Sequence, residues 1–167
     1  EYELVQYGDK IAVCISGGKD SMLMAKLFQE LARHGKKNFE VIFVDNGSSD
    51  GSCSFVAANY PWVHIIELPE NFGFCRAVNE GIRASRAPYV LLLNNDTEVQ
   101  PDFVEEMLLA IKRHGKAFSC GAKMVQYHDR DRLDDAGDFY CALGWSFARG
   151  KDKDIHSCDR EDKVFSA

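Results

Sequence analysis

The chain has 167 residues, of which 46% are hydrophobic and 28% charged, and its net charge is −6 at pH 7. These values are typical of an ordinary globular domain with a hydrophobic core, and the lack of a basic run argues against nucleic acid as the main partner. No stretch has the character of a transmembrane segment or a signal peptide. The six cysteines form no CxxC pair, which favours a reduced, cytoplasmic setting over a metal cluster, with peripheral membrane association as the alternative.

Two apolar segments near the start predict parallel strands joined by a helix. The first is residues 10–15 (KIAVCI) and the second is residues 39–44 (FEVIFV). Between them, apolar residues repeat at helical spacing from Met22 to Leu31, and Gly35 is a natural helix end. A strand–helix–strand unit of this kind is a right-handed parallel crossover.

A glycine-containing turn follows the first predicted strand. It consists of Ser16, Gly17, Gly18, Lys19, Asp20 and Ser21. Glycine lets the backbone approach a ligand closely, and the free N–H groups at a helix start favour an anion such as phosphate. The spacing is not that of a Walker A loop. A tight turn capped by serine or aspartate is the structural alternative.

The second strand ends at Asp45, and Asn-Gly then marks a turn before a predicted helix at about 51–59. A third strand is predicted at 62–68, followed by a loop and a helix at 75–85 that has Arg76 in its first turn. Asp45 could accept hydrogen bonds from a nucleoside and Arg76 could reach a phosphate. A capped turn and a solvated arginine are the alternatives.

The stretch 87–103 (APYVLLLNNDTEVQPDF) contains the most informative pattern. Tyr89 to Leu93 reads as a buried parallel strand that ends in Asn94, Asn95 and Asp96, and Pro101 opens an amphipathic helix. Ligands of open α/β sheets lie at the carboxyl ends of the strands. Oxygen ligands in this place suit a hard divalent cation that bridges phosphates, whereas the alternative is a polar strand-to-helix loop.

The remaining third of the chain gives weaker signals. A fifth strand of the same sheet is predicted within 118–125. The charged stretch from Gln126 (HDRDRLDDAGD) predicts a solvated loop, with a metal cluster as the alternative. The apolar segment 140–147 is expected to pack over a sheet edge, and 149–163 is expected to be loose.

The opening GDKIAVCISGGKDSMLMAKLFQEL resembles the PP-loop ATP pyrophosphatases, in particular the tRNA 2-thiocytidine synthesis enzymes. The resemblance covers about the first quarter of the chain, residues 1–43. It implies that the SGGKDS turn grips the phosphates of ATP. The cysteine pair and the second ATP motif expected of that family are absent.

From residue 39 onward the chain resembles the family 2 glycosyltransferases. The resemblance rests on VDNGSSDGS, ENFGFCRAVNEGIRAS and APYVLLLNNDTEVQPDF, in the order and spacing of the family, and on the later DAGDFYCALGWSFARGKDKD. It implies a GT-A fold, a nucleotide-diphosphate sugar donor, a saccharide or lipid acceptor, and Mg²⁺ or Mn²⁺. It also implies metal binding by Asp96 and donor binding by Asp45, Asn46, Asn71, Arg76, Asn94 and Asn95.

We therefore expect one α/β domain over 1–167, a three-layer Rossmann-like or GT-A-like fold with a mostly parallel sheet, truncated at its C-terminus. Residues 39–125 would bind the donor, and 126–167 would be an irregular, incomplete acceptor side. No catalytic base is assigned, because the family's acceptor-side carboxylate is expected beyond Ala167, and we expect the chain alone to transfer sugar poorly. The alternatives are an ATP-binding PP-loop fragment and a non-catalytic hybrid of the two families.

Overall fold

A computed structural model describes residues 11–16, 39–94 and 96–164. The chain divides into two compact units, Glu1–Glu105 and Glu106–Ala167, and each is described by itself. The expectation of a single domain over 1–167 therefore stays a prediction.

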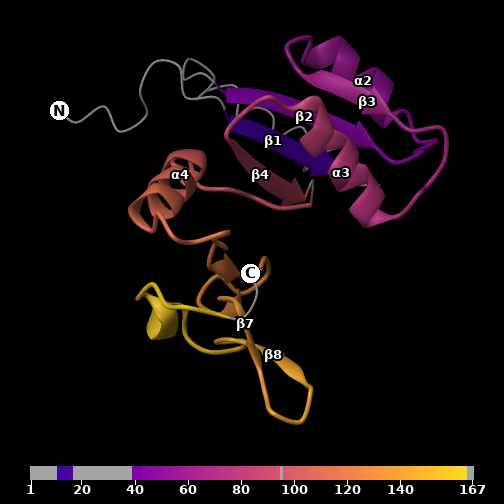
Figure 1. Ribbon diagram of the computed structural model, residues 1–167. Coiled ribbons are helices and arrows are strands. Elements are labelled where there is room, and N and C mark those ends of the chain that lie inside the picture. The colour runs from indigo at the N-terminus through magenta and orange to yellow at the C-terminus, as the bar shows by residue number, and fades with distance from the viewer. Residues whose placement is uncertain (1–10, 17–38, 95, 165–167) are drawn as a thin grey trace. The chain divides into compact units, whose positions relative to one another are not determined.

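A parallel sheet of four strands forms the centre of the first unit, in the order β3-β2-β1-β4 (Figure 1). The strands are β1 (Ile11–Ser16), β2 (Phe39–Asp45), β3 (His64–Glu67) and β4 (Tyr89–Asn94). All four lie where the sequence predicts strands of one sheet. Parallel strands need crossover connections, and helices α2 and α3 lie in the connections from β2 to β3 and from β3 to β4.

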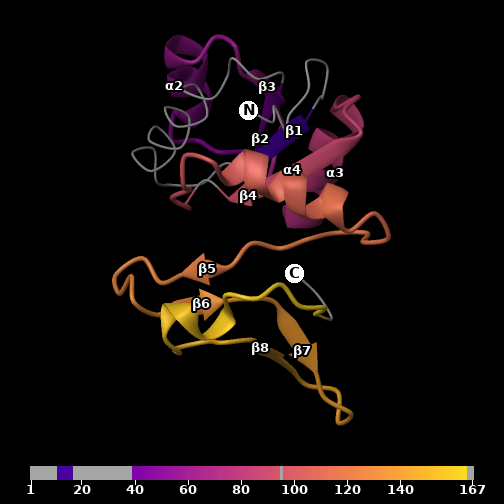
Figure 2. The same ribbon diagram turned by 90° about the vertical axis from the view of Figure 1, so that its left-hand side faces the viewer.

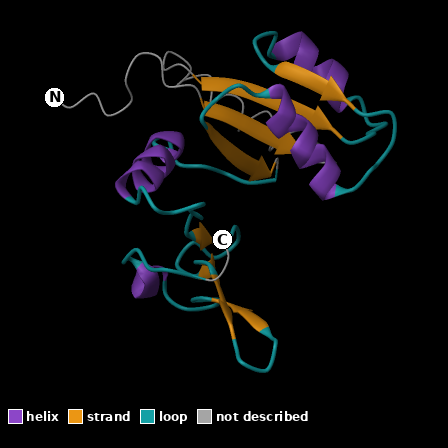
Figure 3. Cartoon of the chain, in the orientation of Figure 1, coloured by secondary structure: helices purple, strands orange, loops and turns teal. Residues whose placement is uncertain are grey.

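The apolar run of β2 is continuous because helices cover both faces of the sheet at this strand. Val41 and Phe43 pack on one face with Val56 of α2 (Ser52–Asn59), while Ile42 and Val44 pack on the other with Ala77 of α3 (Phe74–Ala84). Figure 3 shows α3 lying across its face of the sheet. The predicted three-layer α/β fold is thus confirmed.

Helix α4 (Phe103–Arg113) begins in the first unit and continues into the second. Its first residues, Phe103 and Val104, pack against the core cluster that contains Phe43 and Leu93. The amphipathic pattern that follows Pro101 therefore predicts the helix correctly.

The second unit contains two small antiparallel sheets (Figure 2). One pairs β5 (Met124–Val125) with β6 (Leu133–Asp135), and the other pairs β7 (Asp138–Tyr140) with β8 (Ser146–Ala148). The prediction that 118–125 supplies a fifth strand to the main sheet is wrong. Gly121 and Lys123 interrupt the apolar run, Phe118 is fully exposed, and only the last two residues of the segment pair.

The charged stretches of the second unit are more ordered than their composition suggests. Within 126–138, predicted as a solvated loop, β6 buries Leu133 completely. The segment 149–163, predicted to be loose, contains the 3₁₀ helix η1 (Ile155–Cys158). The apolar segment 140–147 is the tip of the β7–β8 hairpin, where Leu143 and Trp145 are exposed.

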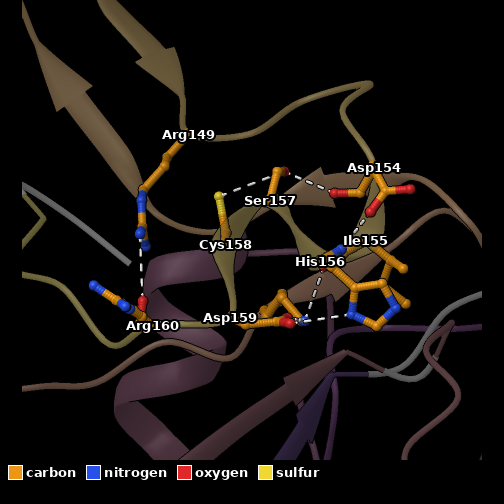
Figure 4. A network of polar contacts seen from close by, with 9 residues as sticks. Arg149, Asp154, Ile155, His156, Ser157, Cys158, Asp159 and Arg160 are labelled. Carbon is orange, nitrogen blue, oxygen red and sulfur yellow. Dashed lines mark hydrogen bonds and ion pairs between the residues drawn. The ribbon is translucent and has the colours of Figure 1, made fainter.

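Polar contacts hold this last segment in place. His156 Nδ1 lies 3.0 Å from Asp159 Oδ2, and Lys123 Nζ donates to Asp159 Oδ1 at 2.7 Å. The hydrogen bond from Lys123, followed by that from His156, lowers the pKa of Asp159. Arg149 Nη2 donates to the carbonyl oxygen of Arg160 at 3.3 Å (Figure 4). These contacts explain why so charged a segment is ordered.

Candidate functional site

The carboxyl ends of β1, β2 and β4 meet at one edge of the sheet. In the strand register Ser16 is paired with both Val44 and Asn94, and Asp45 comes directly after Val44. Asp96 lies two residues beyond the end of β4. The backbone register thus brings Ser16, Asp45 and Asn94 to the same sheet edge, with Asp96 two positions further along the chain, as the sequence predicts.

Asp45 is the most constrained side chain at this edge, being only 3% exposed. Its Oδ2 accepts a hydrogen bond from the backbone N–H of Ser48 at 2.9 Å. Its Oδ1 is buried and has no hydrogen-bond partner within the described ranges. Burying a carboxylate oxygen without a donor is costly, so this atom is suited to accept an N–H or O–H from a ligand.

The electrostatics around Asp45 are negative. Burial, the charges of Asp45 and Glu67, and a side-chain hydrogen bond to Asp45 together raise the pKa of the neighbouring Cys53 thiol to about 12. Glu67 is the register partner of Asp45 on β3. A ligand that offers donors or arrives with a cation is therefore favoured here over a bare anion.

The turn after β2 is tied to the loop before α3 by two side-chain amides. Asn46 Nδ2 donates to Asn71 Oδ1 at 2.9 Å, and Asn46 Oδ1 accepts from the backbone N–H of Phe72 at 2.9 Å. Asn71 Oδ1 also accepts from the N–H of Gly73 at 2.9 Å. The two hydrogen bonds of Asn46 connect residues that are 25 and 26 positions apart in the sequence.

Arg76 lies in the first turn of α3, where its guanidinium carbon is 3.7 Å from the centroid of the Phe72 ring. The arginine side chain is exposed and the phenylalanine is half-buried. Stacking on a ring fixes the guanidinium plane while its N–H groups stay available. The sequence analysis assigns no role to Phe72, which lies in the loop before α3 and so has no helical spacing to Arg76 that would predict the contact.

Asn94 and Asp96 are both exposed. The backbone carbonyl of Asn94 accepts a hydrogen bond from Thr97 Oγ1 at 2.7 Å, which shapes the turn after β4. Among the described residues, no group of three or more histidine, cysteine, aspartate or glutamate side chains is arranged to hold a metal ion. One carboxylate and one amide oxygen fit a hard cation that takes most of its oxygen ligands from phosphates or water.

Several predicted site residues lie outside the described part of the chain. These are Asn95 of the strand-end segment and Gly17, Gly18, Lys19, Asp20 and Ser21 of the glycine turn. For Ser16 the structure gives its backbone position at the end of β1.

The profile of the family described as "Glycosyl transferase family 2" matches residues 22–162, which is most of the chain. The chain belongs to this family. Asp45, Asn94 and Asp96 lie within the matched range, whereas Ser16 at the end of β1 lies before it.

Two solved glycosyltransferases have a similar fold. The mannosyltransferase PcManGT from Pyrobaculum calidifontis, solved with GDP-Man and Mn²⁺, matches with a TM-score of 0.54 and 22% identity over 70% of this chain and 35% of that one. S. aureus TarS 1–349, solved with UDP-GlcNAc, matches with a TM-score of 0.54 and 22% identity over 64% of this chain and 32% of that one. At this identity the similarity establishes a GT-A-like fold.

Curated relatives also come from the PP-loop family. A tRNA-cytidine(32) 2-sulfurtransferase of Cytophaga hutchinsonii is 51% identical over 45 residues, which is 27% of this chain and 15% of the relative. A tRNA-cytidine(32) 2-sulfurtransferase 1 of Francisella tularensis is 28% identical over 155 residues, 78% of this chain and 57% of the relative. These similarities support the resemblance of the opening segment to that family. The chain spans 14% to 57% of the length of the curated relatives it matches.

The helices of the described residues include none that is long and apolar enough to cross a membrane.

Proposed function

We propose that this family 2 chain is the donor-binding part of a metal-dependent glycosyltransferase that uses a nucleotide-diphosphate sugar. The observation that carries the proposal is the buried Asp45, whose unpartnered Oδ1 lies at the strand edge shared with Asn94. Nucleobases and riboses offer the N–H and O–H groups that such an oxygen accepts. The similar PcManGT and TarS structures were solved with nucleotide sugars, which supports the same ligand class here.

Each site residue then has a distinct role. Asp45 accepts a hydrogen bond from the nucleoside, and Arg76 donates to the diphosphate. Asp96 and the Asn94 amide hold a Mg²⁺ or Mn²⁺ ion, which when bound supplies positive charge to the diphosphate leaving group. An acceptor hydroxyl of a saccharide or lipid attacks the anomeric carbon and gives its proton to a base that is not among these residues. The bond from that carbon to the diphosphate breaks, and the nucleoside diphosphate departs with the bonding electron pair.

The test is calorimetric titration of the chain with UDP-GlcNAc and GDP-Man, each with MnCl₂ and with EDTA. We expect a binding signal with at least one donor in Mn²⁺ and a loss of at least about tenfold in EDTA. Asp96→Asn should weaken Mn²⁺-dependent binding, whereas the exposed Asp102→Asn is the matched control and should not. Donor binding that is equal with Mn²⁺ and EDTA contradicts the metal role, and binding of neither donor contradicts the proposal.

A second candidate function is ATP binding by the opening segment, because of its 51% identity to a 2-sulfurtransferase. In that case ATP should bind, Gly18→Val should abolish binding by blocking backbone approach, and Asp45→Ala should have no effect. ATP binding that survives Asp96→Asn, with no donor-sugar signal, would favour this function over the first. A folded chain that binds none of these ligands would indicate a non-catalytic hybrid.

We also propose a reducing compartment such as the cytoplasm. The five cysteines from Cys53 to Cys158, whose side chains the structure describes, are all free thiols, as is usual for intracellular proteins. Mass spectrometry of the chain isolated under alkylating conditions should find them unpaired, and disulfide-linked peptides would contradict the proposal.

A further inference from the structure

Both polar groups of the Asn46 side chain are already used within the protein. The amide nitrogen donates to Asn71 and the amide oxygen accepts from the backbone of Phe72. Asn71 Oδ1 in turn accepts two hydrogen bonds, from Asn46 and from Gly73. An oxygen that accepts two protein hydrogen bonds has little capacity left for a ligand. These three hydrogen bonds give both asparagines a part in shaping the loop.

Backbone packing holds the same two segments together. Gly47 has a φ of 78°, and a Cβ atom built on it would lie 2.6 Å from the carbonyl carbon of Glu70. The turn after β2 therefore touches the loop before α3 directly, with room for no side chain between them. We call the contacts among Asn46, Gly47, Asn71 and Phe72 the asparagine clasp.

Phe72 connects the asparagine clasp to Arg76. The N–H of Phe72 is bound by Asn46, and its ring supports the guanidinium of Arg76 at 3.7 Å. The structure records no carboxylate partner for Arg76 among the described residues, so the ring is the contact that orients this cation. Arg76 and Asn46 thus form two ends of one connected unit beside the strand edge.

We infer that Asn46, Asn71 and Phe72 are positioning residues that aim Arg76 at the diphosphate, and that they do not contact the donor themselves. The inference rests on the proposed function, since it takes the nucleotide diphosphate as the ligand of Arg76. The pre-set guanidinium loses less side-chain entropy when it binds phosphate, which is the source of the gain in affinity.

The experiment measures affinity for UDP and GDP with MnCl₂, and for the matching nucleoside, in Phe72→Leu, Phe72→Tyr and Phe74→Leu. Phe72→Leu should weaken binding of the diphosphate that the wild-type chain accepts by about threefold and leave nucleoside binding unchanged. Phe72→Tyr keeps the ring and should restore affinity. Phe74 is an exposed aromatic two residues away, so Phe74→Leu is the matched control and should have no effect.

A double-mutant cycle with Arg76→Ala separates positioning from general loss of structure. If the ring acts through the arginine, Phe72→Leu and Asn46→Ala should have no further effect on diphosphate affinity once Arg76 is alanine. Losses that persist in the Arg76→Ala background, or that affect the nucleoside equally, overturn the inference while the proposed function stands. A wild-type chain that binds neither UDP nor GDP overturns the proposed function and this inference together. Thermal unfolding of each variant identifies any that fail to fold. If Phe72→Leu is one of these, the affinity of Phe72→Tyr is compared with that of the wild-type chain instead.

Discussion

Asp45 combines near-complete burial with an oxygen that has no partner in the described part of the chain. A side chain kept for folding alone would normally have such an atom paired. Its other oxygen, Oδ2, accepts a hydrogen bond from the backbone N–H of Ser48, an exposed residue. This combination is the reason why we propose that Asp45 binds a ligand.

We predict that Asp45→Ala separates binding from stability. The free energy of unfolding should fall by less than about 1 kcal/mol, because the variant removes a buried unpartnered oxygen as well as one hydrogen bond. Binding of the matching nucleoside should weaken by about tenfold or more, since a hydrogen bond to a charged group is lost. Urea unfolding and calorimetric titration measure the two effects. A large loss of stability with intact nucleoside binding would instead show a structural role.

The cysteines give a second prediction at this scale. Burial and the charges of Asp45 and Glu67 raise the pKa of Cys53 from 9.0 to about 12, whereas backbone hydrogen bonds from Trp145 and Leu143 lower the pKa of Cys141. Because the thiolate is the reactive form, Cys141 should be alkylated by iodoacetamide first and at lower pH than an ordinary thiol. Cys53 should stay unreactive up to about pH 10, and mass spectrometry of peptides sampled between pH 7 and 10 should give this order.

The raised pKa of Cys53 also makes the stability of the fold depend on pH. The folded chain keeps the Cys53 proton to about pH 12, whereas the unfolded chain releases it near 9.0. Between these two values the folded chain holds one proton more than the unfolded chain. The free energy of unfolding therefore falls as the pH rises from 9.0 toward 12. Equal labelling of Cys53 and Cys141 at pH 8 would contradict the assigned environments.

At the scale of elements, the sequence predicts well what depends on local pattern. The runs that became β1 to β4 are apolar and bounded by turn residues, and parallel pairing then brings Asp45 and Asn94 to one edge. Strands of two or three residues, such as β5 and β6, are too short to show an alternation of apolar and polar residues that would predict them. The predicted fifth strand of the main sheet does not form, because Gly121 and Lys123 interrupt the apolar run and only Met124 and Val125 pair.

The asparagine clasp could not be predicted for a different reason. Asn46 and Phe72 are 26 residues apart, and their contact depends on how closely two loop backbones approach after folding. The sequence marks Asn46-Gly47 as a turn but does not say what the turn packs against. The same limit applies to the pairing of Phe72 with Arg76, because Phe72 lies in the loop before α3 and has no helical spacing to Arg76.

Gly47 allows a direct test of the loop contact. Both Gly47 and Gly51 have positive φ, at 78° and 80°, but a Cβ on Gly47 would collide with Glu70 whereas one on Gly51 meets nothing within 4 Å. Gly51→Ala should therefore cost only the backbone term of about 1 kcal/mol, and Gly47→Ala should cost about 1–3 kcal/mol more. Urea unfolding of both variants measures the difference. Equal losses would mean that the two loops separate at little cost.

For the whole molecule, charge separates the two candidate ligand classes. The chain has a net charge of −6, and its described strand edge carries the carboxylates of Asp45, Glu67 and Asp96. A nucleotide diphosphate is also an anion, so long-range repulsion opposes its approach unless a divalent cation is present. The PP-loop alternative works in the opposite way, since it depends on attraction of phosphate to the glycine turn and Lys19.

We therefore predict that added salt strengthens the binding of a nucleotide diphosphate when no metal is present. In EDTA, raising NaCl from about 20 to about 200 mM should strengthen the weak binding of UDP or GDP by about twofold, because salt screens the repulsion. The matching nucleoside has no charge and should bind equally well at both salt concentrations, which makes it the control. Calorimetric or fluorescence titration at the two concentrations measures the change. Metal-free affinity that falls steeply with salt would mean that basic groups dominate the site, as expected if the glycine turn holds the phosphates.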